Sequence, residues 1–271
     1  MVATAALAFA AALLNLPRWV AFRRQRVLRN AFPAAWRKIL QRRVPLFRRL
    51  PVDLQLQLKK HIQIFIAEKT FIGCAGLRIT EEMRVVIAAQ ACLLLLNRNA
   101  DYYPNLRQIL VYPGAFLVDR MSTDSAGLQQ EQREALAGES WTQGQVVLSW
   151  HDCLEGAAVP DDGRNVVIHE FAHQLDQESG HANGAPLPSP GAVPYKRKRW
   201  AAVFSTAYAR LQAEAAAGFT GLLNHYGAKD PAEFFAVVSE VFFEQPAQLQ
   251  QDYPELYREL AGYYQVEPAR W

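Results

Sequence analysis

One stretch of sequence decides the fold of this chain: residues 165–176 read NVVIHEFAHQLD. His169 and His173 are four residues apart, so on a helix both imidazoles lie on one face, one turn apart. Both can therefore reach a single metal ion. Glu170 lies between them, where its carboxylate can take a proton from water at the metal. This arrangement is typical of metal-dependent hydrolases.

The residues around the motif predict a helix. Asn165 or Gly163 can begin it, and Gly180 marks its end. The side chains between these positions are mostly apolar, so we expect the two His and the Glu to be poorly solvated. A buried polar group is costly unless it is paired or coordinated, and a bound metal removes that cost.

A zinc site of this type needs a third protein ligand. An extended motif would place Gly and His at the third and sixth positions after His173, but Asp176 and Ser179 stand there. Cys153 precedes His169 by sixteen residues and lacks the flanking pattern expected of a cysteine ligand. The remaining option is a glutamate on a later helix.

Glu233 is the candidate for that glutamate. Asp230 reads as a helix N-cap and Pro231 as the first helical residue. A Glu three residues after an Asp cap can instead close a capping box, and the local pattern leaves these two readings even. Glu240 and Glu244 lie on nearly the same helix face, so either could be the ligand or could support one from behind.

Two blocks of sequence, 165–176 and 226–243, resemble the Mlc titration factor A family of zinc-dependent peptidases. Two further stretches, 73–96 and 138–150, are also similar, so the resemblance covers about residues 35–265. It implies a zincin-like metallopeptidase with aminopeptidase-like action and a role in regulating a transcriptional repressor. The alternative is a non-catalytic protein that sequesters a transcription regulator.

The same resemblance implies roles for individual residues. His169, His173 and Glu233 would hold one Zn²⁺, Glu170 would be the catalytic base, and Tyr226 would lie near the carbonyl oxygen of the substrate. From the residues alone, Tyr226 also reads as an ordinary half-buried tyrosine.

Two further positions complete the predicted site. Asp176 lies on the metal-facing side of its helix, where it can bond a ligand imidazole or cap a neighbouring loop. Residues 145–150 read as a strand, and an exposed edge at Val147, Leu148 and Ser149 would bind a peptide substrate as an added strand. The alternative is an internal strand without contact to substrate.

The order of predicted elements is α+β. Helices are expected at 53–69 and 80–97, strands at 106–118 and 145–150, and an irregular loop at 183–194, which holds four prolines. We expect a helix with the HExxH motif, a small mixed sheet and a helix with the Glu ligand in one zinc metallopeptidase domain, 49–271, after an N-terminal segment, 1–48. Three scattered cysteines without a CxxC indicate a reducing compartment.

The net charge of +3 conceals an asymmetry. Residues 18–49 hold eleven Lys or Arg and no acid, which leaves 18 bases against 26 acids in the rest of the chain. This basic arm could bind anionic lipid, nucleic acid or the acidic surface of its own body, or simply be solvated. Residues 1–16 are apolar but shorter than the roughly 20 residues of a spanning helix, and they have no basic start. We expect a cytoplasmic protein, peripheral to the inner face of the membrane if it touches a membrane.

Overall fold

The computed structural model of this chain describes most of the sequence, namely residues 17–98, 101–123, 129–136, 138–141, 144–187 and 197–271. The predicted apolar start and the second half of the proline-rich loop lie outside the described residues. Residues 183–187, the first half of that loop, contain neither helix nor strand. No described helix is long and apolar enough to cross a membrane.

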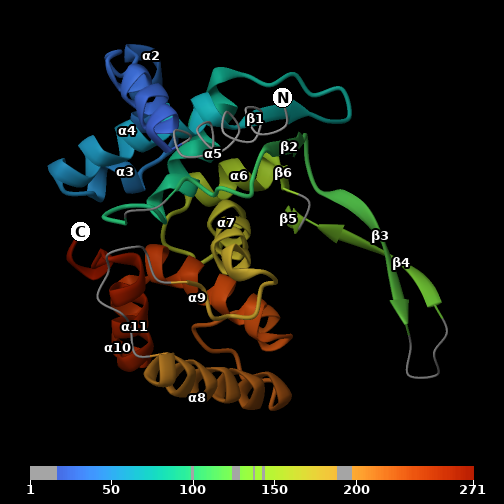
Figure 1. Ribbon diagram of the computed structural model, residues 1–271. Coiled ribbons are helices and arrows are strands. Elements are labelled where there is room, and N and C mark those ends of the chain that lie inside the picture. The colour runs from blue at the N-terminus through green and yellow to red at the C-terminus, as the bar shows by residue number, and fades with distance from the viewer. Residues whose placement is uncertain (1–16, 99–100, 124–128, 137, 142–143, 188–196) are drawn as a thin grey trace, which may run out of the picture.

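The fold is α+β and mostly helical (Figure 1). An amino-terminal helix covers residues 17–28. The later helices are α2 (Ala34–Arg43), α3 (Leu46–Arg49), α4 (Val52–Glu68), α5 (Glu81–Leu93), α6 (Trp150–Ala158), α7 (Val166–Asp176), α8 (Arg197–Ala216), α9 (Pro231–Glu244), α10 (Pro246–Asp252) and α11 (Pro254–Tyr264). Short 3-10 turns are η1 (Gln177–Ser179), η2 (His225–Ala228) and η3 (Pro268–Arg270).

A small mixed sheet lies beside these helices. Its strand order is β1 (Thr70–Gly73), β2 (Gln108–Tyr112), β6 (Gln145–Ser149) and β5 (Gly138–Trp141). The first three strands are parallel, and β5 runs antiparallel to β6. β3 (Phe116–Thr123) and β4 (Gln129–Leu136) form a separate antiparallel ribbon that extends away from the body (Figure 1).

The predicted elements mostly form, with two differences. The predicted helix 53–69 is α4, and the predicted strand 145–150 is β6. The predicted helix 80–97 is α5, capped by the Thr80 hydroxyl, but it already ends at Leu93. The predicted strand 106–118 is two strands in different sheets. Pro113 and Gly114 separate them because a Pro-Gly pair favours a turn.

The apolar core places α7 at the centre of the molecule. Phe171 of α7 packs against Phe65 of α4 and Tyr103, with ring centroids 5.6 and 4.8 Å away. The side chain of Lys69 is buried, and its ammonium donates to the carbonyls of Tyr103 and Leu106 at 2.8 and 2.7 Å. These bonds hold the loop that leads into β2 and keep the aromatic cluster against the motif helix.

Part of the basic segment packs in the body. Leu40, Val44 and Phe47 are buried in the same core as the rest of the chain. Arg42 and Arg43 form ion pairs with Glu82 at the start of α5. The basic arm therefore contacts acidic residues of the protein's own body, which was one of its predicted partners. The boundary at residue 48 between arm and peptidase domain stays a prediction.

Candidate metal centre

The metal-binding motif lies on α7, whose start is fixed by one side chain. Asn165 Oδ1 accepts a hydrogen bond from the backbone N–H of Ile168 at 3.0 Å, which satisfies one of the free donors of the first turn. Val167, Phe171 and Leu175 are fully buried against the core. The apolar residues thus anchor the helix and leave the two His facing Glu233 on α9, while Glu170 lies against Gly138 of β5.

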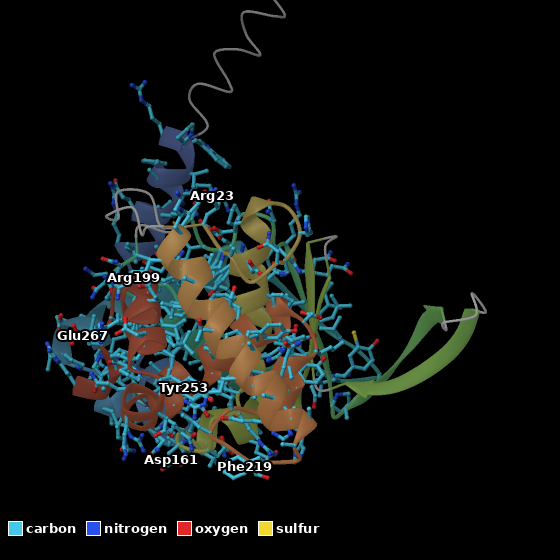
Figure 2. All side chains as sticks on the ribbon, turned by 90° about the horizontal axis from the view of Figure 1, so that it is seen from below. Arg23, Asp161, Arg199, Phe219, Tyr253 and Glu267 are labelled. Atoms are coloured by element: carbon cyan, nitrogen blue, oxygen red, sulfur yellow. The ribbon has the colours of Figure 1, made fainter. Side chains whose placement is uncertain are left out.

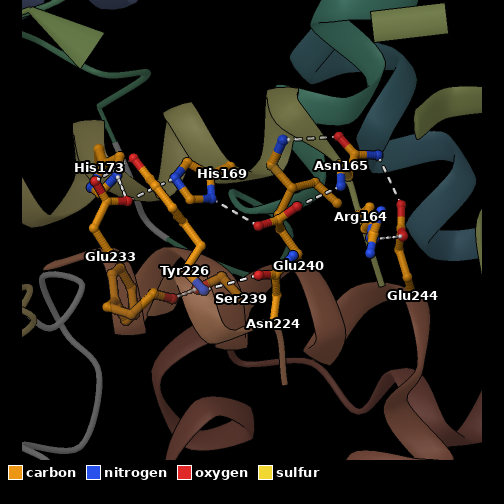
Figure 3. A network of polar contacts seen from close by, with 12 residues as sticks. Arg164, Asn165, His169, His173, Asn224, Tyr226, Glu233, Ser239, Glu240 and Glu244 are labelled. Atoms are coloured by element: carbon orange, nitrogen blue, oxygen red, sulfur yellow. Dashed lines mark hydrogen bonds and ion pairs between the residues drawn. The ribbon is translucent and has the colours of Figure 1, made fainter. Parts of the chain in front are cut away.

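The start of α9 shows that the Glu233 carboxylate does not close a capping box. Asp230 Oδ1 accepts hydrogen bonds from the backbone N–H groups of Ala232 and Glu233 at 3.0 and 2.9 Å, and Pro231 occupies the first turn. Asp230 therefore caps the helix with its own side chain. The Glu233 carboxylate is directed across to α7 (Figure 3).

His169, His173 and Glu233 converge on one point. Glu233 Oε2 lies 3.1 Å from His169 Nε2 and 3.2 Å from His173 Nε2. One donor atom from each of the three residues lies within 4.8 Å of the others. Within the described part of the chain, no other group of His, Cys, Asp or Glu has this spacing. The other candidates for the third ligand, Glu240, Glu244 and Cys153, are not part of this group.

The charges around the imidazoles suit a cation. His169 Nδ1 lies 2.7 Å from Glu240 Oε1. If Nδ1 carries the proton of a neutral imidazole, its Nε2 lone pair points at a carboxylate oxygen of Glu233, which also lacks a hydrogen. Burial alone lowers the pKa of His169, but the carboxylates of Glu240 and Glu233 raise it well above its ordinary value. Two nitrogens and one carboxylate oxygen fit a divalent ion such as zinc.

The carboxylate of Glu233 is held in its charged form. Burial on its own raises the pKa of this group, but the hydrogen bonds with His169 and His173 lower it well below its usual range. Tyr226 donates its hydroxyl proton to Glu233 Oε1 at 3.1 Å, and Lys229 Nζ lies 3.6 Å from the same oxygen. An anionic carboxylate is the form that binds a metal ion.

Glu170 lies beside this group with one oxygen unpaired. Its side chain is only 5% exposed, and Oε2 has no hydrogen-bond partner. Burial is the main cause that raises the pKa of Glu170 to about 7, while His169 and His173 oppose the rise. Glu170, His169 and Tyr226 line one cleft of about 400 Å³. Glu170 thus borders the cleft, and its unpaired oxygen is buried behind the cleft wall.

Tyr226 lines the same cleft from η2. Asn224 Oδ1 accepts from the Tyr226 backbone N–H at 2.9 Å, which fixes the start of this turn. The Tyr226 side chain is 43% exposed, and its ring centroid lies 6.0 Å from that of His169. The tyrosine predicted from the resemblance thus reaches the same group as the predicted ligands.

Asp176 makes one of its two predicted contacts. Its oxygens accept hydrogen bonds from the backbone N–H groups of Asn183, Gly184 and Ala185 at 2.7, 2.6 and 3.1 Å. Asp176 therefore caps the neighbouring loop. Nδ1 of His173 has no hydrogen-bond partner, so Asp176 does not bond that nitrogen.

Comparison with known proteins agrees with this geometry. The sequence matches the family described as glucose-regulated metallo-peptidase M90 over residues 19–265. The chain belongs to the M90 metallopeptidase family. The family resemblance predicted from the sequence blocks is thereby confirmed.

Curated relatives cover most of this M90 family member. An uncharacterized protein of Synechocystis sp. is 37% identical over 272 residues, which span 99% of this chain and 97% of that protein. Mlc titration factor A of Klebsiella pneumoniae is 32% identical over 229 residues, 83% of this chain and 84% of the relative. Mlc titration factor A of Yersinia enterocolitica is 31% identical over 240 residues, 87% and 86% of the two chains.

The expectation of a free strand edge at Val147, Leu148 and Ser149 is wrong. In this M90 fold, β6 pairs with β2 on one side and with β5 on the other. The three side chains are buried. The edge strand on this side of the sheet is β5, which the alternation of side chains did not indicate.

Two contacts of the M90 site were not predicted from the sequence. A Cβ added to Gly138, the first residue of β5, would lie 2.7 Å from Glu170 Oε1. Glu244 accepts from the Arg164 backbone N–H and the Asn165 amide, each at 2.9 Å, and so ties α9 to the start of α7 (Figure 3). The only sequence signal for Gly138 was its place in a block that resembles the family.

Proposed function

We propose that this M90 family member is a zinc-dependent peptidase in which His169, His173 and Glu233 hold one Zn²⁺. The observation that carries the proposal is the convergence of these three donors, from two helices, within 4.8 Å. Zinc prefers four ligands in a tetrahedron, and catalytic sites keep one of them for water. When bound, zinc supplies Lewis-acid chemistry, which polarises a carbonyl and lowers the pKa of water.

We assign the proton transfers to Glu170. Its buried Oε2 has no other partner, so it is free to accept a proton from water that attacks the peptide carbonyl. The same oxygen then delivers the proton to the leaving amine. The exposed Tyr226 hydroxyl, which lines the same cleft, turns from Glu233 Oε1 and donates its hydrogen bond to the carbonyl oxygen as negative charge develops there.

We propose that the substrate binds along β5. This strand ends the sheet on the side of α7, and a sheet edge can bind an extended peptide through its backbone groups. Gly138 supports this position because its missing side chain lets the strand approach Glu170 closely. The backbone of the substrate would then lie between β5 and the metal ligands.

Removal of amino-terminal residues is the proposed reaction. Asp152 and Glu155 line the cleft that contains Glu170. Asp162 and Arg164 line it as well, and because the acids outnumber the one arginine, the cleft favours a cationic amino terminus over a carboxylate terminus. Matched peptides with free and acetylated amino termini test this assignment, and equal turnover of both would contradict it.

The decisive experiment is Glu170→Gln. We expect this variant to keep its zinc, because the three ligands are unchanged, and to lose hydrolysis by about a hundredfold or more. Zinc content by atomic absorption and peptide turnover are measured on the same sample. Glu255→Gln, an exposed glutamate on α11, is the control and should keep full activity. Undiminished turnover in Glu170→Gln would contradict the proposal.

A second proposal concerns a transcriptional repressor. The relatives are named for titration of Mlc, and we propose that this chain likewise binds a repressor protein in the cytoplasm. The three cysteines are scattered and form no CxxC, and this usage supports a reducing compartment. If binding is the main function, it should survive His169→Ala, which removes a metal ligand. A pull-down with the repressor in which His169→Ala abolishes binding would contradict a role independent of the metal.

A further inference from the structure

We propose that the amino-terminal helix, residues 17–28, binds the surface of an anionic lipid bilayer. This inference does not depend on the metal site or on the proposed peptidase activity. It rests on how the helix is attached to the body, on which side chains it exposes, and on the sequence that precedes it.

One face of the helix is fixed to the body. Arg24 forms ion pairs with Glu68 at 2.6 Å and Asp101 at 2.7 Å, and its guanidinium lies 4.6 Å from the ring centroid of Tyr102. Leu28, one turn further on, packs against the apolar core. The helix is therefore held along one side and cannot turn that side to a partner.

The opposite face is basic and aromatic. At about 100° per residue, five exposed side chains of the helix, together with Arg29 directly after it, fall within an arc of about 140° that is centred opposite Arg24. They are Arg18, Trp19, Phe22, Arg23, Arg26 and Arg29. This set, the basic-aromatic face, contains no acid, and the first acidic residue of the chain is Asp53. In Figure 2 the helix with Arg23 lies at the end of the molecule opposite Asp161 and Phe219.

The exposure of the two aromatic side chains favours a bilayer as the partner. Trp19 and Phe22 are each 56% exposed although they are large and apolar. The Arg23 guanidinium lies 4.8 Å from the ring centroid of Trp19. A helix that lies in a membrane interface has this composition: basic residues meet the lipid phosphates, and aromatic residues enter between the headgroups.

The preceding sequence favours a bilayer over nucleic acid. Residues 1–16 carry no charged side chain, and all of them except Thr4 and Asn15 are apolar. An uncharged apolar segment directly before the basic-aromatic face adds to the affinity for lipid. It adds nothing to contacts with nucleic acid phosphates, which depend on positive charge.

Co-sedimentation of the full chain with vesicles tests the proposal. We expect binding to vesicles of phosphatidylcholine with about 30 mol % phosphatidylglycerol and at least about tenfold weaker binding to pure phosphatidylcholine vesicles. Raising NaCl from about 0.1 M to about 0.5 M should weaken the binding because salt screens the charges. Equal binding to both kinds of vesicle, or none to either, would overturn the proposal.

Two variants assign the binding to this face. Replacing Arg18, Arg23, Arg26 and Arg29 together by Gln should reduce vesicle binding by about a hundredfold or more. Trp19→Ser with Phe22→Ser should reduce it about tenfold without a change in net charge. Both variants should keep the wild-type melting temperature and peptide turnover, because these side chains are exposed and do not touch the site.

The matched control removes the same charge elsewhere. Four exposed basic residues outside the helix, Lys60, Lys198, Arg258 and Arg270, are replaced together by Gln. This variant should keep most of its vesicle binding, and a loss as large as that of the arginine variant would show a non-specific charge effect and overturn the assignment. Duplex DNA is the second ligand in the same assay. Tight, arginine-dependent binding to DNA without binding to vesicles would replace the bilayer with nucleic acid.

Discussion

His169 Nδ1 lies 2.7 Å from Glu240 Oε1, and Glu240 Oε2 accepts the backbone N–H of Asn165 at 2.5 Å. The carboxylate is thus fixed from two sides and can hold the proton of His169 on Nδ1. Nε2 is then left with its lone pair toward Glu233, which is the tautomer that a metal ligand needs.

From this contact we expect Glu240→Gln to weaken metal binding. A glutamine amide keeps the size of the side chain but loses the charge that favours an Nδ1 proton. Changes to such supporting partners typically cost about 10- to 100-fold in metal affinity. Zinc titration against a competing chelator measures the effect. Glu244→Gln, one turn further along α9 and without contact to His169, should change the affinity less than about threefold. Equal affinities in wild type and Glu240→Gln would contradict this role.

Metal removal should lower the thermal stability of the wild type. A ligand that binds only the folded state at about 100 times its Kd adds about 2.7 kcal/mol to the free energy of unfolding. For a chain of this size we expect zinc to raise the Tm of the chelated protein by about 5–10 °C. Glu233→Ala should show no such rise, whereas Glu255→Ala should behave like wild type. Differential scanning calorimetry of each protein with chelator and with zinc gives the comparison.

Gly138→Ala tests the close approach of β5 to the motif helix. The new Cβ would lie 2.7 Å from both Cγ and Oε1 of Glu170 and from a methyl group of Val166. We expect the Glu170 carboxylate to move, with a loss of about tenfold to a hundredfold in peptide turnover. Zinc affinity should be unchanged because the ligands do not touch this atom. Gly262→Ala on α11, where a Cβ meets nothing within 4 Å, is the control. Full turnover in Gly138→Ala would argue against the position of β5 in the site.

Acid should destabilise the fold through His61, outside the metal site. His61 Nδ1 lies 2.6 Å from the Tyr102 hydroxyl, and Nε2 is buried without a partner. Burial, aided by Lys60, lowers the pKa of His61 to about 4 from an ordinary 6.5. The neutral form is favoured by folding, so its contribution is complete above pH 6.5 and is lost as the pH falls through about 4. The difference between the pKa values of His61 in the unfolded and folded states corresponds to at most about 3 kcal/mol in the free energy of unfolding.

Urea unfolding at several pH values measures this loss. We expect His61→Gln to flatten the curve of unfolding free energy between pH 6.5 and about 4, because glutamine does not titrate. His151→Gln, at an exposed histidine, should leave the slope of the wild type. A His61→Gln curve parallel to that of the wild type would remove this histidine as the cause.

The sequence predicted what depends on neighbours along the chain. The cap at Asn165, the spacing of His169 and His173, and the apolar positions between them are local, so α7 could be located before the structure was known. Asp230 and Pro231 likewise located the start of α9. Where Glu233 points was not local, because a capping glutamate and a ligand have the same neighbours in the sequence. Only the packing of α7 on α9 shows that the Glu233 carboxylate points to His169 and His173 and not back to the helix cap.

Features that depend on tertiary pairing were beyond such reasoning. The edge of the sheet was assigned to Val147, Leu148 and Ser149 because strand order cannot be read from alternation alone. Gly138 begins a strand of four residues, too short to give a periodic signal. By helix geometry, Asp176 could bond a ligand imidazole or a neighbouring loop equally well. The backbone N–H groups at 183–185 reach its oxygens only because the chain folds back after α7.

Glu240 and Glu244 on α9 both bind the beginning of α7 at Asn165 and Arg164. These bonds fasten together the two helices that carry the three proposed ligands, and none of them involves an ion. The coordination shell is consequently preassembled by folding, and we expect a stripped protein to be reloaded within the mixing time of an added cation, without a slow refolding phase.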